Sequence, residues 1–545
     1  MKRIQVILFI LILLIAVFTR FYRLGEIPMG IHADEASQGY NAYSLLKTGK
    51  DMYGKLFPIL FRANGSYQPP VYTYLTIVPI FLFGNTVSSV RFVSALAGLL
   101  LVGVTFLFVY LFGIGKKEDK ITQALIASVV LAISPWSIHF SRLAIEGNLV
   151  VVFFVLGLLL ALLSLKKKWF FVFACLVFAF TTHVYYTERI TSILFMAVFV
   201  LFNRKIFLKQ KKEVLIGLVV FVLVMIPHLV ISESGALTKR LSEVGYIKDI
   251  NNVDGGLINK TTFLTGKFAD HYFSYFSPKN LFFDPGQDLG RTSQDLAVFY
   301  PWFFIFALAG VRYLLQYNSE TMTKLLALVI VIGPLPASIT GDPFYPLRVL
   351  TYLWGITLVV SYGFNYFWNW FGLKRIRMLT VSLILFYSIL HFYISYFATS
   401  KYASSPDLSY SYIKLVDELS KYKDKKVFID FSGRAWGVGI RLAYLLKADP
   451  TKTQDNLSSQ LGTPYYSGDV NAWETFRIDN ITIEPINWLE ICGGDVIVVG
   501  DRYSISENQI KDHKMKLEFV VKNAVYEDVL FGYLASGKCS EPQNR

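Results

Sequence analysis

Long apolar runs recur along the first 400 residues of the chain and constrain its fold more than any other feature. About 20 consecutive apolar residues span a lipid bilayer as one α-helix. The first run covers residues 4–18, and the others cover 88–113, 121–135, 145–165, 169–186, 189–203, 213–230, 296–316, 323–340, 347–368 and 376–397. The sequence therefore predicts a mainly α, polytopic membrane protein with about 11 transmembrane helices, or about 12–13 if weaker segments also cross.

One segment, at residues 69–84, decides the predicted topology. It is apolar, but it has 16 residues with three prolines, so we expect it to lie at the interface or dip in without crossing. The first run, which lacks a cleavage site, is expected to be a retained span with Lys2 and Arg3 inside. The basic loops then share that side, as the positive-inside rule requires. They hold Lys116, Lys117, Lys120, Lys166, Lys167, Lys168, Arg204, Lys205, Lys209, Lys211, Lys212, Lys374, Arg375 and Arg377.

The same topology collects the polar segments on the outer face. They are the first outer loop at 19–87, the turns at 136–147, 184–190 and 341–348, the second long outer loop at 231–295, and residues 401–545. We predict a transmembrane domain over 1–400, a soluble extracytoplasmic domain over 401–545, and chemistry on the outside. The net charge of +14 is explained by the basic loops, so no nucleic-acid partner is expected.

An acidic pair, Asp34 and Glu35, stands in the first outer loop where a short helix could begin after Pro28 and Gly30. Carboxylates are favoured at a helix N-terminus, so one interpretation is a helix cap. The other is catalytic, because the pair lies close to the bilayer in a protein rich in outer arginines. As neighbours on a helix, the two side chains diverge by roughly 100°, unlike the facing carboxyl pair of a glycosidase.

Three arginines, Arg142, Arg189 and Arg348, stand at the outer ends of predicted spans, in turns that also hold His139 and Tyr186. Each could simply extend toward lipid headgroups. Together they indicate a shared anionic site, since the guanidinium fork suits a phosphate. An outward-facing transferase cannot draw on cytosolic nucleotide sugars and needs a donor delivered through the membrane. A polyprenyl-phosphate sugar meets that need, and one carboxylate could then act as the base.

An ordered set of motifs over residues 1–400 carries a family resemblance. It comprises Arg23-Leu24, Pro28, Asp34-Glu35-Ala36, Gly39-Tyr40-Asn41-Ala42, Thr48-Gly49, Gly54, Pro58, Gln68-Pro69-Pro70-Val71-Tyr72, Phe83-Gly84, Arg91, Ser134-Pro135-Trp136, Ser141-Arg142, Phe276-Ser277-Pro278, Leu281-Phe282, Pro336-Ala337 and Arg348. The set resembles the bacterial relatives of the dolichyl-phosphate-mannose protein mannosyltransferases, a group of the C-type glycosyltransferase superfamily that includes the lipid A aminoarabinose transferase.

The resemblance implies a C-type glycosyltransferase fold with juxtamembrane helices in the first outer loop. It also implies an inverting hexosyl- or pentosyltransferase that uses a polyprenyl-phosphate sugar, with Asp34 as base and Glu35 in support. Many relatives have Lys or His before the Pro-Pro, whereas this chain has Gln68. Neutralisation of the donor phosphate then rests on Arg142, Arg189, Arg348 or Arg62.

Several questions stay open at this level. The acceptor could be a protein, a lipid or a wall polymer. A lipid-linked glycan polymerase or ligase, or a transporter or flippase for a lipid-linked or anionic substrate, are the alternative functions. A transporter should show paired halves and polar residues at mid-membrane, and neither is evident. A divalent ion is left open, because no ligand spacing is diagnostic and no metal ligand is assigned.

Residues 401–545 have the pattern of a small α/β domain. Helices are expected at 410–422 and 439–447, and strands at 426–431, 495–500 and 516–522. Cys492 and Cys539 could pair if the compartment is oxidising.

Overall fold

The computed structural model describes residues 3–286, 295–370, 374–399, 409–431, 437–471, 473–488, 491 and 495–535. The chain forms two compact units. The first comprises Met1–Leu24, Arg91–Glu233 and Leu237–Thr399. The second comprises Gly25–Val90, Ser234–Ala236 and Ser400–Arg545. The second unit thus joins the first loop to the C-terminal part of the chain.

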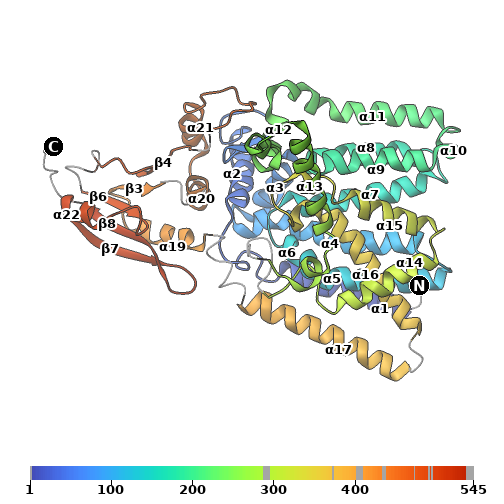
Figure 1. Cartoon of the computed structure of the whole chain (residues 1–545). Coiled ribbons are helices and arrows are strands. Elements are labelled where there is room, and N and C mark those ends of the chain that lie inside the picture. The colour runs from blue at the N-terminus through green and yellow to red at the C-terminus, as the bar shows by residue number, and fades with distance from the viewer. Residues whose placement is uncertain are drawn as a thin grey trace. The chain divides into compact units, whose positions relative to one another are not determined.

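The first unit is a bundle of helices in which α7, α8 and α11 pack in series and α14 packs on α16 (Figure 1). Its helices are α1 (Arg3–Phe21), α4 (Val87–Phe112), α5 (Lys117–Ile133), α6 (Pro135–Ser141), α7 (Glu146–Ser164), α8 (Phe170–Val184), α9 (Glu188–Phe202), α10 (Arg204–Phe207), α11 (Lys211–Val230), α12 (Ala236–Val244), α13 (Leu257–Ser274), α14 (Phe303–Gln316), α15 (Thr321–Ile332), α16 (Leu350–Trp370) and α17 (Lys374–Phe392). Short helical turns join them, among them η5 (Pro346–Val349) and η6 (Tyr393–Thr399).

Every run that the sequence predicts as a span contains a helix. Over the residues that the structure describes, seven helices are long and apolar enough to cross a bilayer, and the pair α5–α6, bent by 59°, makes an eighth. The bend falls at Pro135, since a proline ends the preceding helix. The other three predicted spans, α8, α9 and α14, have 15, 15 and 14 residues. The chain is a multi-pass membrane protein.

Two glycines bring α14 and α16 into direct backbone contact. A Cβ atom on Gly310 would lie 1.9 Å from the Val359 carbonyl oxygen, and one on Gly363 would lie 1.7 Å from that of Phe306. Small residues allow such close helix packing, which is typical of membrane interiors where apolar side chains gain nothing by leaving lipid.

The second unit contains α2 (Ala33–Thr48), the hairpin of β1 (Phe61–Ala63) and β2 (Ser66–Gln68), and α3 (Pro70–Phe83). Helix α3 is the segment predicted not to cross. It has 14 residues with Pro79 inside, and it packs on α2. Its length of about 21 Å is shorter than the bilayer core of about 30 Å, in keeping with that prediction.

The C-terminal residues of this unit form an α/β structure. A six-stranded mixed sheet has the order β4-β5-β3-β6-β8-β7, in which β3 runs parallel to β5 and β6. The strands are β3 (Lys426–Asp430), β4 (Phe476–Ile478), β5 (Ile481–Glu484), β6 (Val496–Gly500), β7 (Met515–Lys522) and β8 (Asp528–Ala535). The helices are α19 (Tyr410–Leu419), α20 (Val438–Leu445), α21 (Pro450–Ser458) and α22 (Glu507–Asp512).

The five C-terminal elements expected from the sequence are all present. The apolar strand β6 is buried along its whole length, as a central strand should be. Cys492 and Cys539, for which a disulfide was considered, lie outside the described residues.

Candidate active site

The acidic pair opens helix α2 of the second unit, and its two carboxyl groups have different surroundings. His32 is the N-cap residue, and its Nδ1 accepts a hydrogen bond from the Asp34 backbone N–H at 3.2 Å. The Glu35 carboxylate accepts one from the His32 backbone N–H at 3.1 Å, which completes a capping box. Glu35 is 1% exposed. Its carboxylate therefore fixes the start of the helix.

The Asp34 side chain, by contrast, is 43% exposed. Its Oδ1 lies 3.4 Å from the Gln68 amide nitrogen, which also contacts the Asp34 carbonyl oxygen at 3.4 Å. Its Oδ2 lies 3.6 Å from His32 Nδ1. Asp34 is thus held by its neighbours while its carboxylate stays partly exposed.

Arg62 and Gln68 stand on opposite faces of the β1–β2 hairpin, since Phe61 pairs with Gln68 and Arg62 with Tyr67. Arg62 is 1% exposed and lies over the Tyr53 ring at 5.7 Å. Its Nε and Nη1 atoms have no hydrogen-bond partner among the described residues.

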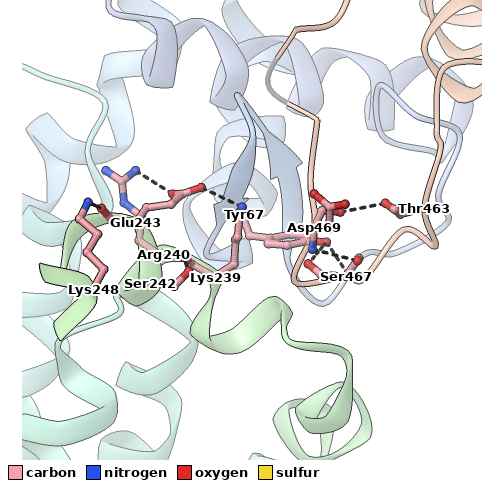
Figure 2. Close-up of polar contacts among 9 residues, drawn as sticks. All are labelled: Tyr67, Lys239, Arg240, Ser242, Glu243, Lys248, Thr463, Ser467 and Asp469. Atoms are coloured by element: carbon pink, nitrogen blue, oxygen red, sulfur yellow. Dashed lines mark hydrogen bonds and ion pairs between the residues drawn. The ribbon is translucent and has the colours of Figure 1, made fainter. Parts of the chain in front are cut away.

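The hairpin and the preceding turn share a buried polar cluster with the C-terminal residues. The Tyr53 hydroxyl donates to Glu474 at 2.6 Å, and the Tyr465 hydroxyl donates to Asp51. Burial raises the pKa of Asp51 to about 6 and that of Glu474 to about 7. The Tyr67 hydroxyl also bonds to the backbone of Ser467 (Figure 2). The cluster fixes the first loop against the C-terminal segment.

The three predicted arginines all lie in the first unit, but the structure groups them in two places. Arg142 is fully buried. Its guanidinium donates to the carbonyl oxygens of Thr19 at 2.9 Å and Tyr22 at 2.7 Å, and it lies over the Phe397 ring at 5.0 Å. Its charge neighbours are Arg20 and Arg91. The Arg142 guanidinium thus joins the end of α1 to η6.

Arg189 and Arg348 each lie near one of two consecutive tyrosines, Arg189 near Tyr186 and Arg348 near Tyr185. Arg189 lies 4.6 Å from the Tyr186 ring centroid, and burial raises the pKa of this phenol while the Arg189 charge opposes the rise. Burial also raises the pKa of Tyr185, and the Arg348 charge lowers it. The charge of Glu146 also raises the pKa of both phenols. This group combines cationic and hydroxyl donors as an anion site would.

The two guanidinium groups differ in how fully they are bonded. Arg189 donates to the Leu237 carbonyl oxygen at 3.0 Å, and its buried Nη2 has no hydrogen-bond partner within the described part of the chain. Arg348 pairs with Asp342 at 2.9 Å and donates to the Thr340 hydroxyl at 2.6 Å. The Asp342 side chain is exposed, so this ion pair can exchange for another anion.

Helix α12 adds a cation, Arg240, that the sequence did not predict. Arg240 reaches the same tyrosine pair and lies 3.6 Å from Glu243, which also pairs with Lys239 at 3.5 Å (Figure 2). The missed signal was the amphipathic stretch at 236–244, which places basic residues on one face of a helix.

His139 is buried on α6 in edge contact with Tyr396 and Phe140. Over the described ranges, no three His, Cys, Asp or Glu side chains come together in a way that could hold a metal ion.

Comparison with known proteins gives a family match and a shared fold. Residues 67–231 match the family described as dolichyl-phosphate-mannose-protein mannosyltransferase. ArnT from Cupriavidus metallidurans in the apo state is 13% identical with a TM-score of 0.54, and 97% of each chain is covered. The structure of ArnT bound to undecaprenyl phosphate is 12% identical with a TM-score of 0.53, and 98% of each chain is covered. No curated protein matches the sequence.

These findings confirm the predicted resemblance and the predicted fold, a mainly helical C-type glycosyltransferase fold with a small C-terminal sheet region. They also agree with the predicted class of enzyme, a glycosyltransferase.

Proposed function

We propose that this chain transfers a sugar from a polyprenyl-phosphate donor to an extracytoplasmic acceptor, with inversion at the sugar carbon and Asp34 as the general base. The observation that carries the proposal is the difference between the surroundings of the two acidic side chains. Glu35 is buried and caps the helix, whereas Asp34 presents a partly exposed carboxylate beside Gln68. The family match and the fold shared with ArnT, one of whose structures holds undecaprenyl phosphate, support the choice of donor.

The chemistry requires one base. Asp34 takes the proton of the acceptor hydroxyl, whose oxygen attacks the anomeric carbon as the bond from that carbon to the phosphate oxygen breaks. The departing polyprenyl phosphate is already a stable anion, so no carboxylic acid is needed to protonate it. Attack from the face opposite the leaving group inverts the configuration. Gln68 restrains Asp34 by hydrogen bonding and contributes no charge.

We assign the donor phosphate to Arg189 and Arg348 of the first unit. Arg189 has a buried nitrogen with no hydrogen-bond partner among the residues that the structure describes, and the ion pair of Arg348 is with an exposed carboxylate. Tyr186, stacked on Arg189, offers a hydroxyl to the same anion. Arg142 lies apart from this group, joins the end of α1 to η6 and is fully buried, so we give it a structural role.

The proposed location of the chemistry is the extracytoplasmic face. Its support is the charge of the short loops. The positive-inside rule predicts that Lys117, Lys167 and Lys212 lie on the cytoplasmic side and residues 19–87 on the other. A donor that crosses the membrane attached to its lipid serves such a site without ATP or nucleotide sugars.

The test uses membranes of cells that express the chain and a panel of radiolabelled polyprenyl-phosphate hexoses and pentoses, with and without EDTA. We expect transfer by the wild type, loss of at least about 100-fold in D34N, and unchanged transfer in D455N, an exposed aspartate on α21. Transfer by D34N at the wild-type rate overturns the assignment of the base. Labelling of an Asp34→Cys variant only from the cytoplasm overturns the proposed location.

A further inference from the structure

The C-terminal helix α20 packs directly on the start of α2, within the second unit. Gly437 precedes α20 with φ +72°, and a Cβ atom there would lie 2.5 Å from the Ala33 Cβ. On α2, a Cβ atom on Gly39 would lie 2.6 Å from the Tyr444 ring. Two glycines on opposite sides of the interface thus allow the helices to meet without a gap. The acidic pair begins at this interface.

Arg441 of α20 points to the backbone just before helix α2, the helix that begins with the acidic pair. The side chain is 4% exposed, and its Nε donates to the Ile31 carbonyl oxygen at 3.1 Å. That carbonyl immediately precedes the N-cap residue His32. The Arg441 guanidinium also lies within electrostatic reach of the Asp34 and Glu35 carboxylates. One side chain of the C-terminal region therefore touches the backbone and faces both charges of the motif.

We propose that Arg441 is a positioning residue for Asp34, supplied to the active site by the C-terminal part of the chain. This inference rests on the function proposed above. Its hydrogen bond anchors the backbone where α2 begins, which sets the direction of the Asp34 side chain. Its positive charge attracts the carboxylates of the acidic pair, which helps to hold the Asp34 side chain in one orientation.

The burial of Arg441 argues for a task beyond packing. A guanidinium loses much of its hydration when buried, and this cost is offset only by good geometry with partners of opposite charge. An apolar side chain would fill the same space between α20 and α2 at lower cost. The Tyr412 ring, 6.0 Å from the Arg441 guanidinium, supports the cation from the other side.

Two substitutions separate the charge from the hydrogen bond. R441Q keeps an amide that can donate to the Ile31 carbonyl oxygen and removes the charge. R441K keeps the charge on a flexible stem and loses the planar fork. The control is R477Q, which removes an exposed arginine from β4 of the same sheet region. D34N serves as the reference for loss of the base.

The experiment measures kcat and KM for the radiolabelled polyprenyl-phosphate sugar that the wild type consumes, with a melting curve for each variant. We expect R441Q to lower kcat about 10- to 100-fold with KM within about twofold, because the base and not donor binding is disturbed. R441K should recover at least about tenfold of that loss, and R477Q should match the wild type. The double variant D34N/R441Q should be no slower than D34N, because Arg441 acts through Asp34.

Each adverse result has its own meaning. Full activity of R441Q beside an inactive D34N overturns the role of Arg441 and leaves the proposed function intact. Equal losses in R441Q and R441K that follow a lowered melting temperature reduce Arg441 to a packing residue and also overturn the inference. If R441Q does not fold, R441K decides: a folded R441K as slow as D34N contradicts the proposal. Activity of D34N at the wild-type level overturns the proposed base instead.

Discussion

The substitution E474Q tests whether a buried carboxyl group lowers the stability of the second unit at neutral pH. Burial raises the pKa of Glu474 from 4.5 to about 7, although the Tyr53 hydroxyl donates to it and the Arg62 charge lies nearby. The folded chain therefore binds this proton more tightly than the unfolded chain does. Under that condition stability is highest at low pH and falls as the pH rises through the interval between the two values.

The size of the effect follows from the two pKa values. One pKa unit corresponds to about 1.4 kcal/mol of free energy. With pKa values of about 7 in the folded state and 4.5 in the unfolded state, the free energy of unfolding of the wild type falls by about 2.5 kcal/mol between pH 5 and pH 8. A glutamine side chain has the same shape as glutamate, can still accept a hydrogen bond from the Tyr53 hydroxyl, and does not ionise. Since about 1 kcal/mol moves the melting temperature by roughly 2–4 °C in a domain of this class, E474Q should reduce the drop between pH 5 and pH 8 by about 5–10 °C.

The assay follows tryptophan fluorescence during heating of the detergent-solubilised protein at pH 5, 6, 7 and 8. E507Q, at an exposed position on α22, is the matched control and should leave the drop unchanged. A residual drop is expected in E474Q, because burial also raises the pKa of Asp51, to about 6. An E474Q protein with the pH dependence of the wild type, or an E507Q protein that flattens it equally, refutes the reasoning.

Three more outcomes can be measured on purified protein. R189K and R348K keep the charge but lose the fork, so initial rates should show KM for the donor raised about tenfold; an unchanged KM contradicts the phosphate assignment. R142M removes the donors that bind the carbonyl oxygens at the end of α1, and should destabilise the first unit by about 2–5 kcal/mol in thermal melts. G437A should cost at least about 1–2 kcal/mol because of its positive φ and its contact with α2, whereas G462A, with open space around it, should not.

The helical bundle was predictable because its signal is local. A span needs a continuous apolar run, and each such run in the sequence contains a helix. Several of the missed strands lack such a signal: β1, β2 and β4 have three residues each, and β8 contains Gly532 and shows no alternation of buried and exposed residues. Their strand conformation comes from pairing partners, which a sequence window does not contain.

The sequence predicted only part of the arrangement at the candidate site. Of the two interpretations of the acidic pair, the helix cap is seen in Glu35; Asp34 is partly exposed, and its catalytic role stays a prediction. Arg441 and Glu474 were missed because they contact residues about 400 positions earlier. No periodicity or spacing connects such distant positions. Arg142 looked equivalent to Arg189 and Arg348 in sequence, and it is distinguished in the structure by its position at the end of α1 and over the Phe397 ring.

Because the second unit contains both the first loop and the C-terminal residues, it cannot fold completely until the end of the chain has been synthesised. The bond between Tyr40 and Thr453 joins residues 413 positions apart, and that between Tyr53 and Glu474 joins residues 421 apart. At about 5–20 residues per second, a ribosome completes the later partner roughly 20–80 s after the earlier one. During that interval the first loop has left the ribosome without the partners that bury it. The second unit can therefore finish folding only after its last helices and strands have been translated. Until then the first loop is accessible to chaperones.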